Sequence, residues 1–262
     1  MIKLIASDLD GTLLLNGSSK CNPKVYALIE KLTEEGVYFL AASGRQYQSL
    51  QKLFYPVRDK IMYLCENGAM VIHNNEVLQK HAMEPELAMK ICHEVMGETE
   101  CEILISGEKN SYLLSTNQKY VDYICNVMGN AVKFVKSPEE IQEPIVKIAA
   151  CAPEDKMEAV KKRLEKKLKK HCQLVTSGNK WLDFLENGIS KGAALKTLGK
   201  KLGILPEEMM AFGDNENDRT MLSFVGHPYL MRSCNPTMKD MGEKVLFCDT
   251  VEEELEKFLK NK

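Results

Sequence analysis

Two aspartates separated by one residue follow an apolar run near the start of the chain. The run Ile2-Lys3-Leu4-Ile5-Ala6 precedes the segment Asp8-Leu9-Asp10-Gly11-Thr12. In a strand, side chains at positions i and i+2 point to the same face, and Gly11 can turn the chain where the strand ends. Two carboxylates held this close either repel, which raises one pKa, or share a hard divalent cation with a bound anion. Both outcomes suit chemistry on a phosphate group.

Two other structures can contain the pattern Asp-x-Asp-Gly, namely a calcium loop and an ordinary turn. A calcium-binding EF-hand loop that starts at Asp8 needs glycine at its sixth position and a carboxylate at its twelfth. The chain has Leu13 and Ser19 at these positions, which excludes that loop. A plain turn at the end of a strand stays open on these residues alone, so partners elsewhere in the chain decide.

Composition limits the kind of protein and the kind of partner. The chain has 262 residues, 44% of them hydrophobic, which suffices for one large or two modest domains. The net charge of −2 provides no field that attracts nucleic acid or an anionic membrane, so a small-molecule ligand is favoured. The sequence shows neither an export signal nor the roughly 20 apolar residues of a membrane span. Nine cysteines without a Cys-x-x-Cys pair favour reduced thiols, and together these features predict a cytoplasmic protein.

Hydrophobic patterning predicts an α/β fold built on a Rossmann-like parallel sheet. Strands are expected at residues 2–6, 37–42 and 61–65, with helices between them at 23–32 and from Ser43-Gly44-Arg45 to about 54. After Asn187-Gly188 the alternation resumes, with a helix at 191–202 and a strand at 209–212. The segment between these two parts of the chain has the pattern of a mixed α+β module. The expected domains are therefore a core formed by 1–82 and 187–262 and an insertion at 83–186.

Polar groups follow several of these elements, and a parallel sheet would bring them to one edge. Ser43 and Gly44 follow the second strand, where a hydroxyl and free N–H groups at the start of a helix could cradle an anion. Lys191 lies in the first turn of a helix, where its charge does not complement the helix dipole. Asp214, placed to complete a metal site, follows a later strand with Asn217 and Asp218. Each feature alone has an ordinary explanation, but their joint occurrence favours a catalytic site.

With these residues in this order, the chain resembles the haloacid dehalogenase superfamily. Its four motifs correspond to Asp8-Leu9-Asp10-Gly11-Thr12, Ser43 after an apolar strand, Lys191 opening a helix, and Gly213-Asp214-x-x-Asn217-Asp218. The insertion, with Asn67-Gly68-Ala69 and the segment that begins at Ser190, is similar to the Cof-type phosphatases with a large α+β cap, subclass IIB. The resemblance covers both ends of the chain well, and the insertion only in size and element order. One departure lies at 226–231, where the family would have an alanine-rich strand that ends in valine.

The resemblance implies a phosphatase that works through an aspartyl-phosphate intermediate. Asp8 is then the nucleophile, and Asp10 protonates the leaving oxygen and later takes a proton from water. The implied cofactor is Mg2+, bound by Asp8, Asp214 and the backbone carbonyl of Asp10, which offsets the repulsion between the nucleophile and the phosphate dianion.

The resemblance also implies which residues hold the phosphate and which support them. Ser43, the backbone amide of Gly44 and Lys191 bind the oxygens on which charge builds, and Asn217 touches the phosphoryl group. Asp218 orients Lys191 or a metal-bound water from behind the residues that contact the phosphate, and Thr12 is placed behind them as well.

The substrate is expected to be a small phosphorylated metabolite, with sugar phosphates favoured. The inserted cap selects it and moves on hinges near Met83 and Asn187. Trp181 could stack on a ring of the substrate or pack inside the cap, and Arg45 could line the entrance or lie in solvent; both choices stay open. A phosphomutase acting on sugar phosphates and a non-catalytic phosphate- or metal-binding module are the alternatives.

Overall fold

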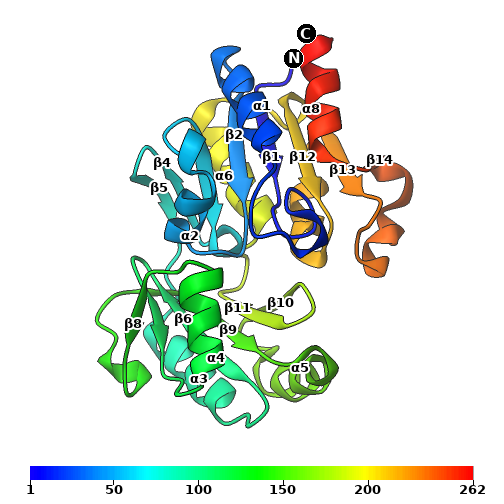
Figure 1. Ribbon diagram of the computed structural model, residues 1–262. Helices are drawn as coiled ribbons and strands as arrows, with labels where there is room; N and C mark the ends of the chain where they lie inside the picture. The colour runs from blue at the N-terminus through cyan, green and yellow to red at the C-terminus, as the bar shows by residue number, and fades with distance from the viewer. Residues whose placement is uncertain (262) are drawn as a thin grey trace. The chain divides into compact units, whose positions relative to one another are not determined.

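The computed structural model describes residues 1–261, and the chain folds into two compact units (Figure 1). The first unit contains Met1–Gln79 and Ser190–Lys262, and the second contains Lys80–Ile189. The sequence predicts the second unit at 83–186, so the two junctions differ from the expected ones by a few residues. None of the helices within residues 1–261 is long and apolar enough to cross a membrane.

The core unit is built on one eight-stranded sheet with the order β14-β13-β12-β1-β2-β3-β4-β5. Its strands are β1 (Leu4–Ser7), β2 (Tyr38–Ala42), β3 (Met62–Cys65), β4 (Met70–His73), β5 (Glu76–Lys80), β12 (Met209–Gly213), β13 (His227–Met231) and β14 (Leu246–Cys248). The strands from β14 to β3 pair in parallel, and β4 pairs antiparallel with β3. The predicted α/β fold with a parallel-sheet core and an inserted α+β domain is confirmed.

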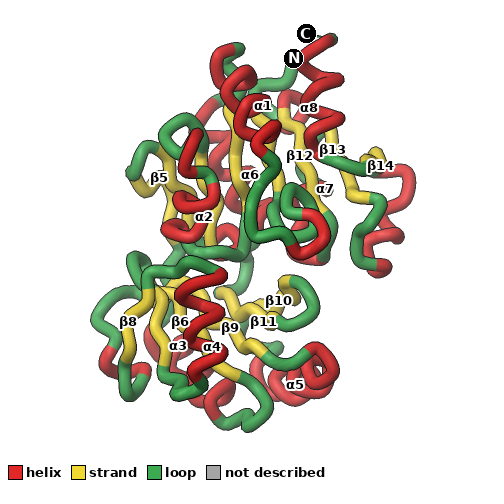
Figure 2. Tube along the Cα trace, in the orientation of Figure 1, coloured by secondary structure: helices red, strands yellow, loops and turns green. Residues whose placement is uncertain are grey.

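Helices lie between most of the parallel strands along the chain, and Figure 2 shows helices and strands in separate colours. They are α1 (Pro23–Glu34), α2 (Tyr47–Leu53), α6 (Lys191–Leu202), α7 (Arg219–Leu222) and α8 (Val251–Lys260). Three of them begin at side-chain caps, because Asn22 accepts a hydrogen bond from the Lys24 N–H, Ser190 accepts one from the Ala193 N–H and Thr250 accepts one from the Glu253 N–H. Helix α6 ends at Gly203, whose left-handed backbone is easiest for glycine.

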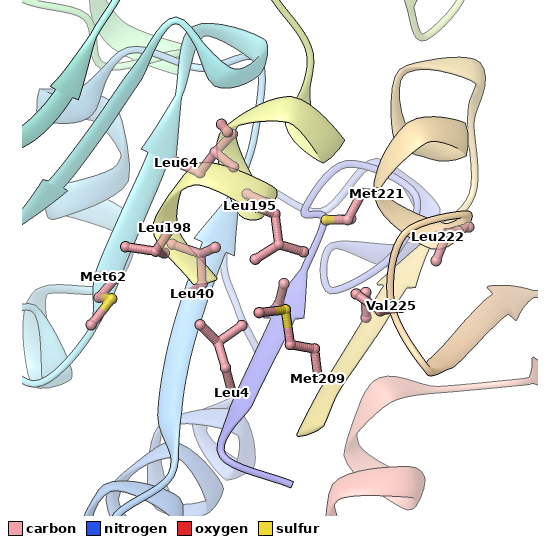
Figure 3. Close-up of a cluster of buried hydrophobic side chains, with 14 of the residues drawn as sticks. Leu4, Leu40, Met62, Leu64, Leu195, Leu198, Met209, Met221, Leu222 and Val225 are labelled. Atoms are coloured by element: carbon pink, nitrogen blue, oxygen red, sulfur yellow. The ribbon is translucent and has the colours of Figure 1, made fainter. Parts of the chain in front are cut away.

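Helix α6 is fixed to the sheet by a large apolar cluster (Figure 3). Leu195 and Leu198 on α6 share this cluster with Leu4 of β1, Leu40 of β2 and Met209 of β12. Burying a leucine side chain contributes about 2 kcal/mol. The cluster therefore holds the first residue of α6, Lys191, in register with the ends of β1 and β12.

The inserted unit contains a six-stranded sheet with the order β10-β11-β9-β6-β7-β8. Its elements are α3 (Pro85–Met96), β6 (Glu102–Gly107), β7 (Ser111–Leu113), α4 (Gln118–Asp122, continued by a π-helical turn at Tyr123–Val127), β8 (Val132–Phe134), β9 (Ile145–Cys151), α5 (Glu154–Leu168), β10 (Gln173–Ser177) and β11 (Trp181–Leu185). Helices α3 and α5 share one apolar cluster with the sheet and α4 another. Trp181 packs against the α4 cluster and stacks on Tyr123.

One predicted element starts in a different place. The sequence predicts a helix that opens at Ser43-Gly44-Arg45, but α2 begins at Tyr47, so this prediction is wrong. The Ser43 N–H donates to the Leu64 carbonyl at 2.8 Å, and the Ser43 carbonyl accepts from the Asn67 N–H at 3.0 Å. Since these backbone groups pair with the neighbouring strand and loop, they are not available to the first turn of a helix.

Replacing Glu143 with glutamine is expected to destabilise the inserted unit at neutral pH. Burial raises the pKa of Glu143, but hydrogen bonds from Tyr112, from Asn110 and from the Lys109 N–H outweigh it and lower the pKa below its ordinary value. A depressed pKa contributes stability above the pKa of the unfolded state, and this stability is lost as the pH falls through the lower, folded-state value. We expect a loss of about 1 kcal/mol near neutral pH, discounted because the carboxylate is partly exposed.

The measurement is the midpoint of thermal unfolding of both proteins, near neutral pH and in acid. The difference should shrink in acid, where Glu143 itself becomes protonated. Glu158→Gln is the control, since the Glu158 side chain is 70% exposed and pairs only across one helical turn. Equal midpoints at neutral pH would contradict the prediction.

Candidate active site

Asp8 lies where the central strand of the core sheet ends. Ser7, the last residue of β1, pairs with Ala41 of β2 on one side and with Phe212 of β12 on the other. The Asp8 N–H continues this pattern by donating to the Phe212 carbonyl at 3.0 Å. Asp8 is only 5% exposed. The sequence therefore places a buried carboxylate in the middle of the carboxyl edge of the sheet.

Lys191 extends into this edge from the first turn of α6. Its ammonium Nζ donates to Asp8 Oδ1 at 2.5 Å and to Asp218 Oδ1 at 2.7 Å, and the residue is completely buried. Burial alone would lower the pKa of Lys191, but Asp218 and Asp8 more than offset it and raise the pKa above its ordinary value. The lysine is therefore a fixed positive charge between two carboxylates.

The loop after β12 supplies the other two carboxylates. Asp218 Oδ2 accepts hydrogen bonds from the N–H groups of Asp214 (3.0 Å) and Asn215 (3.1 Å), which folds the loop around it. Asp214 Oδ1 accepts from Thr12 Oγ1 at 3.0 Å. Carboxylate oxygens of Asp8, Asp214 and Asp218 all lie within 4.8 Å of one another. One lysine therefore faces three acidic groups, which leaves an excess of negative charge.

Two of these carboxylates, Asp8 and Asp214, have a raised pKa. Burial, followed by repulsion from Asp218, raises the pKa of Asp8 well above its ordinary value. The same two causes raise the pKa of Asp214 to about 6. Both shifts mean that the folded protein holds these negative charges at a cost, which a bound cation would relieve.

Glycine is required at position 11, in the turn that follows Asp8 and Asp10 and lies against Asp214. Its φ is +96°, a left-handed conformation that L-residues rarely adopt, and a Cβ atom there would overlap the Asp214 carboxylate. Gly11→Ala is therefore expected to displace Asp214 and to lower turnover about 100-fold, the cost of misplacing a group of the active site. The measurement is phosphate release, the activity that the sequence resemblance implies, by the purified variant.

Gly17→Ala is the matched control for this substitution. Gly17 also has a positive φ, +69°, but no atom lies within 4 Å of the position that its Cβ would take. It therefore carries the backbone strain without the overlap. If both alanine variants lose the same activity, overlap with Asp214 is not the reason for the glycine at position 11.

Asp10 is not one of the three carboxylates that the structure groups together, Asp8, Asp214 and Asp218. Its two oxygens accept from Arg45, at 2.8 Å from Nε and 2.5 Å from Nη2, and its side chain is 57% exposed. The Asp10 carboxylate therefore has the two-pronged guanidinium of Arg45 as its partner, and the expectation that Asp8 and Asp10 emerge together stays a prediction. Of the two alternatives for Arg45, lining the entrance or lying in solvent, the structure excludes the second. The Arg45 side chain is mostly buried and pairs with Asp10.

The remaining predicted phosphate-binding residues surround Asn67. Asn67 has a left-handed backbone, its N–H bonds the Ser43 carbonyl, and its Oδ1 accepts from Asn217 Nδ2 at 3.1 Å. A Cβ on Gly44 would crowd the Asn67 amide group. Asn67 therefore joins Ser43 and Gly44 to the loop that carries Asn217.

Comparison with known proteins agrees with this geometry. The sequence profile of the haloacid dehalogenase-like hydrolases matches residues 5–252, a range that includes Asp8, Lys191, Asp214 and Asp218. The chain belongs to this family. The predicted superfamily and the prediction of an enzyme that catalyses hydrolysis are confirmed.

Three proteins to which this haloacid dehalogenase-like hydrolase is similar are named as phosphatases. The chain is 25% identical over 232 residues (88% of this chain, 86% of the relative) to the 5-amino-6-(5-phospho-D-ribitylamino)uracil phosphatase of Escherichia coli strain K12. It is 26% identical over 240 residues (91% and 87%) to the HMP-PP phosphatase of Enterobacter sp. strain 638. A solved subclass IIB sugar phosphatase of the superfamily superimposes with a TM-score of 0.81 and covers 98% of both chains at 19% identity, which shows the shared fold.

Sequence reasoning missed one contact of this hydrolase and left another open. It gave Asn67 no contact with Asn217, and it left Asp218 to orient either Lys191 or a metal-bound water, of which the structure shows the contact with Lys191. Both contacts join residues that are distant along the chain, so no local periodicity indicates them. The positive φ of Asn67 has a local signal, the Asn67-Gly68 pair typical of turns.

Proposed function

We propose that this protein is a Mg2+-dependent phosphatase that hydrolyses small phosphomonoesters through an aspartyl-phosphate on Asp8. The observation that carries the proposal is the buried ammonium group of Lys191, which bridges Asp8 and Asp218 beside Asp214. A buried cation fixed beside a carboxylate nucleophile can bind the oxygens of a phosphate group as their charge increases. Membership in a hydrolase family and the phosphatase names of the relatives support the assignment.

The residues at this edge fit a magnesium ion. Mg2+ prefers hard oxygen ligands and is commonly held by one or two carboxylates together with phosphate oxygens. Asp8 and Asp214 offer such oxygens in a site with excess negative charge, and we assign them, with the Asp10 backbone carbonyl, as the ligands. When bound, Mg2+ would offset the repulsion between the Asp8 carboxylate and the phosphate dianion.

The proposed reaction has two displacements at phosphorus. An Asp8 oxygen attacks phosphorus, the ester P–O bond breaks, and the leaving oxygen takes a proton from Asp10. Asp10 then accepts a proton from a water molecule whose oxygen attacks phosphorus, and the bond to Asp8 breaks to release inorganic phosphate. Asp10 has to leave its ion pair with Arg45 to do this work.

The other residues of the site bind and orient. Lys191, Ser43 and the Gly44 N–H are assigned to the oxygens of the transferring group, and Asn217 to the phosphoryl group. Asp218 accepts a hydrogen bond from Lys191 and is assigned to orienting it. Thr12 donates a hydrogen bond to Asp214 and is assigned to orienting that carboxylate.

The proposed substrates are small phosphorylated metabolites, with sugar and sugar-alcohol phosphates favoured. The E. coli relative is named for a substrate that carries its phosphate on a ribityl chain, which supports a polyol phosphate. We assign substrate selection to the inserted unit, since the core motifs contact only the phosphoryl group and its ester oxygen. A cytoplasmic location is part of the proposal, because nine cysteines without a Cys-x-x-Cys pair suit a reducing compartment.

A screen of phosphorylated metabolites tests this function. Sugar phosphates, nucleotides and cofactor phosphates are incubated with the protein and Mg2+, and with a chelator in parallel, while free phosphate is measured. Phosphate release that the chelator abolishes is the expected result. Conversion of one sugar phosphate into an isomer without free phosphate would indicate a phosphomutase, and binding without turnover would indicate a non-catalytic module.

A further inference from the structure

Arg219, which the proposed function does not use, joins the loop of Asp214 to a second segment of the core. Its guanidinium donates hydrogen bonds to both carboxylate oxygens of Glu216, at 2.9 Å from Nε and 2.8 Å from Nη2. The same group donates to Asp240 Oδ1 at 2.7 Å and to the Thr237 carbonyl at 2.9 Å. Glu216 lies in the loop between Asp214 and Asp218, whereas Thr237 and Asp240 lie in the 3-10 helical segment Pro236–Lys244.

A second connection joins the same two segments at the other end. The Asn235 N–H donates to the Asp214 carbonyl at 2.9 Å. The side-chain oxygen of Asn235 accepts from the Thr237 N–H at 3.1 Å and from Thr237 Oγ1 at 2.9 Å. The segment from Asn235 to Asp240 is therefore attached to the loop both at Asp214 and, through Arg219, at Glu216.

The loop needs such support because its own structure is short and its charges repel. It contains a single 3-10 turn, Glu216–Asp218, followed by a helix of four residues, Arg219–Leu222. Short helices have little stability of their own. Asp214 at its start also has a carboxylate oxygen within 4.8 Å of one of Asp218, so the two negative charges repel each other. Thr12 and Lys191 hold the side chains of Asp214 and Asp218. Arg219 adds an attachment at Glu216, between these two carboxylates, that opposes an outward movement of Asp214.

We propose that Arg219 is a positioning residue that holds Asp214 in place for the divalent cation. The inference rests on the proposed function, and it assigns Arg219 no contact with substrate or reacting atoms. The planar fork of an arginine is needed, since a lysine can replace neither the paired bonds to Glu216 nor the simultaneous contacts to Asp240 and Thr237. Supporting residues of this kind typically change metal affinity by about 10- to 100-fold when they are replaced.

The test measures Mg2+ binding by titration calorimetry, in the absence of substrate, in wild type and in Arg219→Met. We expect the variant to bind Mg2+ about tenfold more weakly. At saturating Mg2+ its turnover should return to near the wild-type value, which a general loss of structure would not allow. Arg232→Met is the matched control, because Arg232 makes one exposed ion pair, 3.4 Å to Asp249. An unchanged Mg2+ dissociation constant in Arg219→Met would overturn the proposal.

Two further variants decide the question if Arg219→Met does not fold. Arg219→Lys keeps the charge without the fork, and Asp240→Asn removes one anchor at a side chain that is 67% exposed. Weaker Mg2+ binding in both supports the proposal, and wild-type binding in both overturns it. If the wild-type protein neither binds Mg2+ nor releases phosphate, the proposed function and this inference fail together. If it does both and only the variants are unchanged, the inference alone fails.

Discussion

Asp8→Asn is expected to lose turnover by a factor on the order of 10⁴ or more, because the amide cannot form the acyl-phosphate bond. The same substitution should not weaken the fold. Three carboxylates crowd one buried ammonium group, and the raised pKa of Asp8 shows that its charge is unfavourable in this place. Removing that charge while keeping the shape of the side chain is expected to leave the unfolding temperature equal to or above that of wild type.

Three measurements check the expectation for Asp8. They are phosphate release, thermal unfolding and trapping of phosphoenzyme, which should appear in wild type and be absent from the variant. Asp59→Asn is the control, since the Asp59 side chain is 74% exposed and lies outside the cluster. Turnover at the wild-type rate in Asp8→Asn would reject Asp8 as the nucleophile.

Lys191→Met is expected to damage both catalysis and stability. Breaking a buried ion pair by removing one partner typically costs about 3 to 5 kcal/mol, because the other charge stays buried without compensation. Two carboxylates lose their partner here, since Nζ bonds both Asp8 and Asp218. Loss of the donor that we assign to the transferring phosphate should also reduce turnover about 100-fold or more.

The pH dependence separates this electrostatic cost from a simple packing defect. A carboxylate whose folded-state pKa is raised destabilises the folded protein above that pKa, and the penalty is relieved as the pH falls through it. The pKa of Asp214 is already raised to about 6 in the presence of Lys191. The stability deficit of Lys191→Met should therefore shrink as the pH is lowered through this range, as measured by thermal unfolding.

A compensating variant provides the control for Lys191. Adding Asp218→Asn to Lys191→Met removes one of the two stranded carboxylates and should recover part of the stability, but none of the turnover. If the double variant is no more stable than Lys191→Met, the lysine acts mainly through packing of its side chain.

The positions of the main elements could be predicted because their signals are local. Alternating apolar runs indicate the parallel strands, and Asn22, Ser190 and Gly203 mark helix ends through caps that involve only nearby backbone groups. From this order alone, Asp8 and Asp214 fall at the ends of strands that turn out to be neighbours in the sheet. That part of the site follows from topology.

The orientations of the side chains could not be predicted in the same way. The Asp10 carboxylate pairs with Arg45, and Asp218 bonds Lys191, one of the two partners that the sequence leaves open for it. Each contact depends on which of several possible partners lies nearest in space, and sequence spacing does not encode that distance. The segment Pro236–Lys244 was also unforeseen, because its 3-10 turns lack the apolar period of a longer helix.

The pairing of β1 with β12 also determines when the enzyme can become competent during its synthesis. One neighbour of β1, the strand β2, leaves the ribosome soon after it, whereas the other is translated only after the whole inserted unit. Domains commonly fold as units while translation continues, so the inserted unit can be complete while half of the core is still unmade. Until β12 and α6 arrive, the nascent chain exposes one apolar flank of β1 and carries Asp8 without its ammonium partner. A pause in translation just after residue 189 would therefore leave an inactive polypeptide with an open strand edge, the kind of species that chaperones bind.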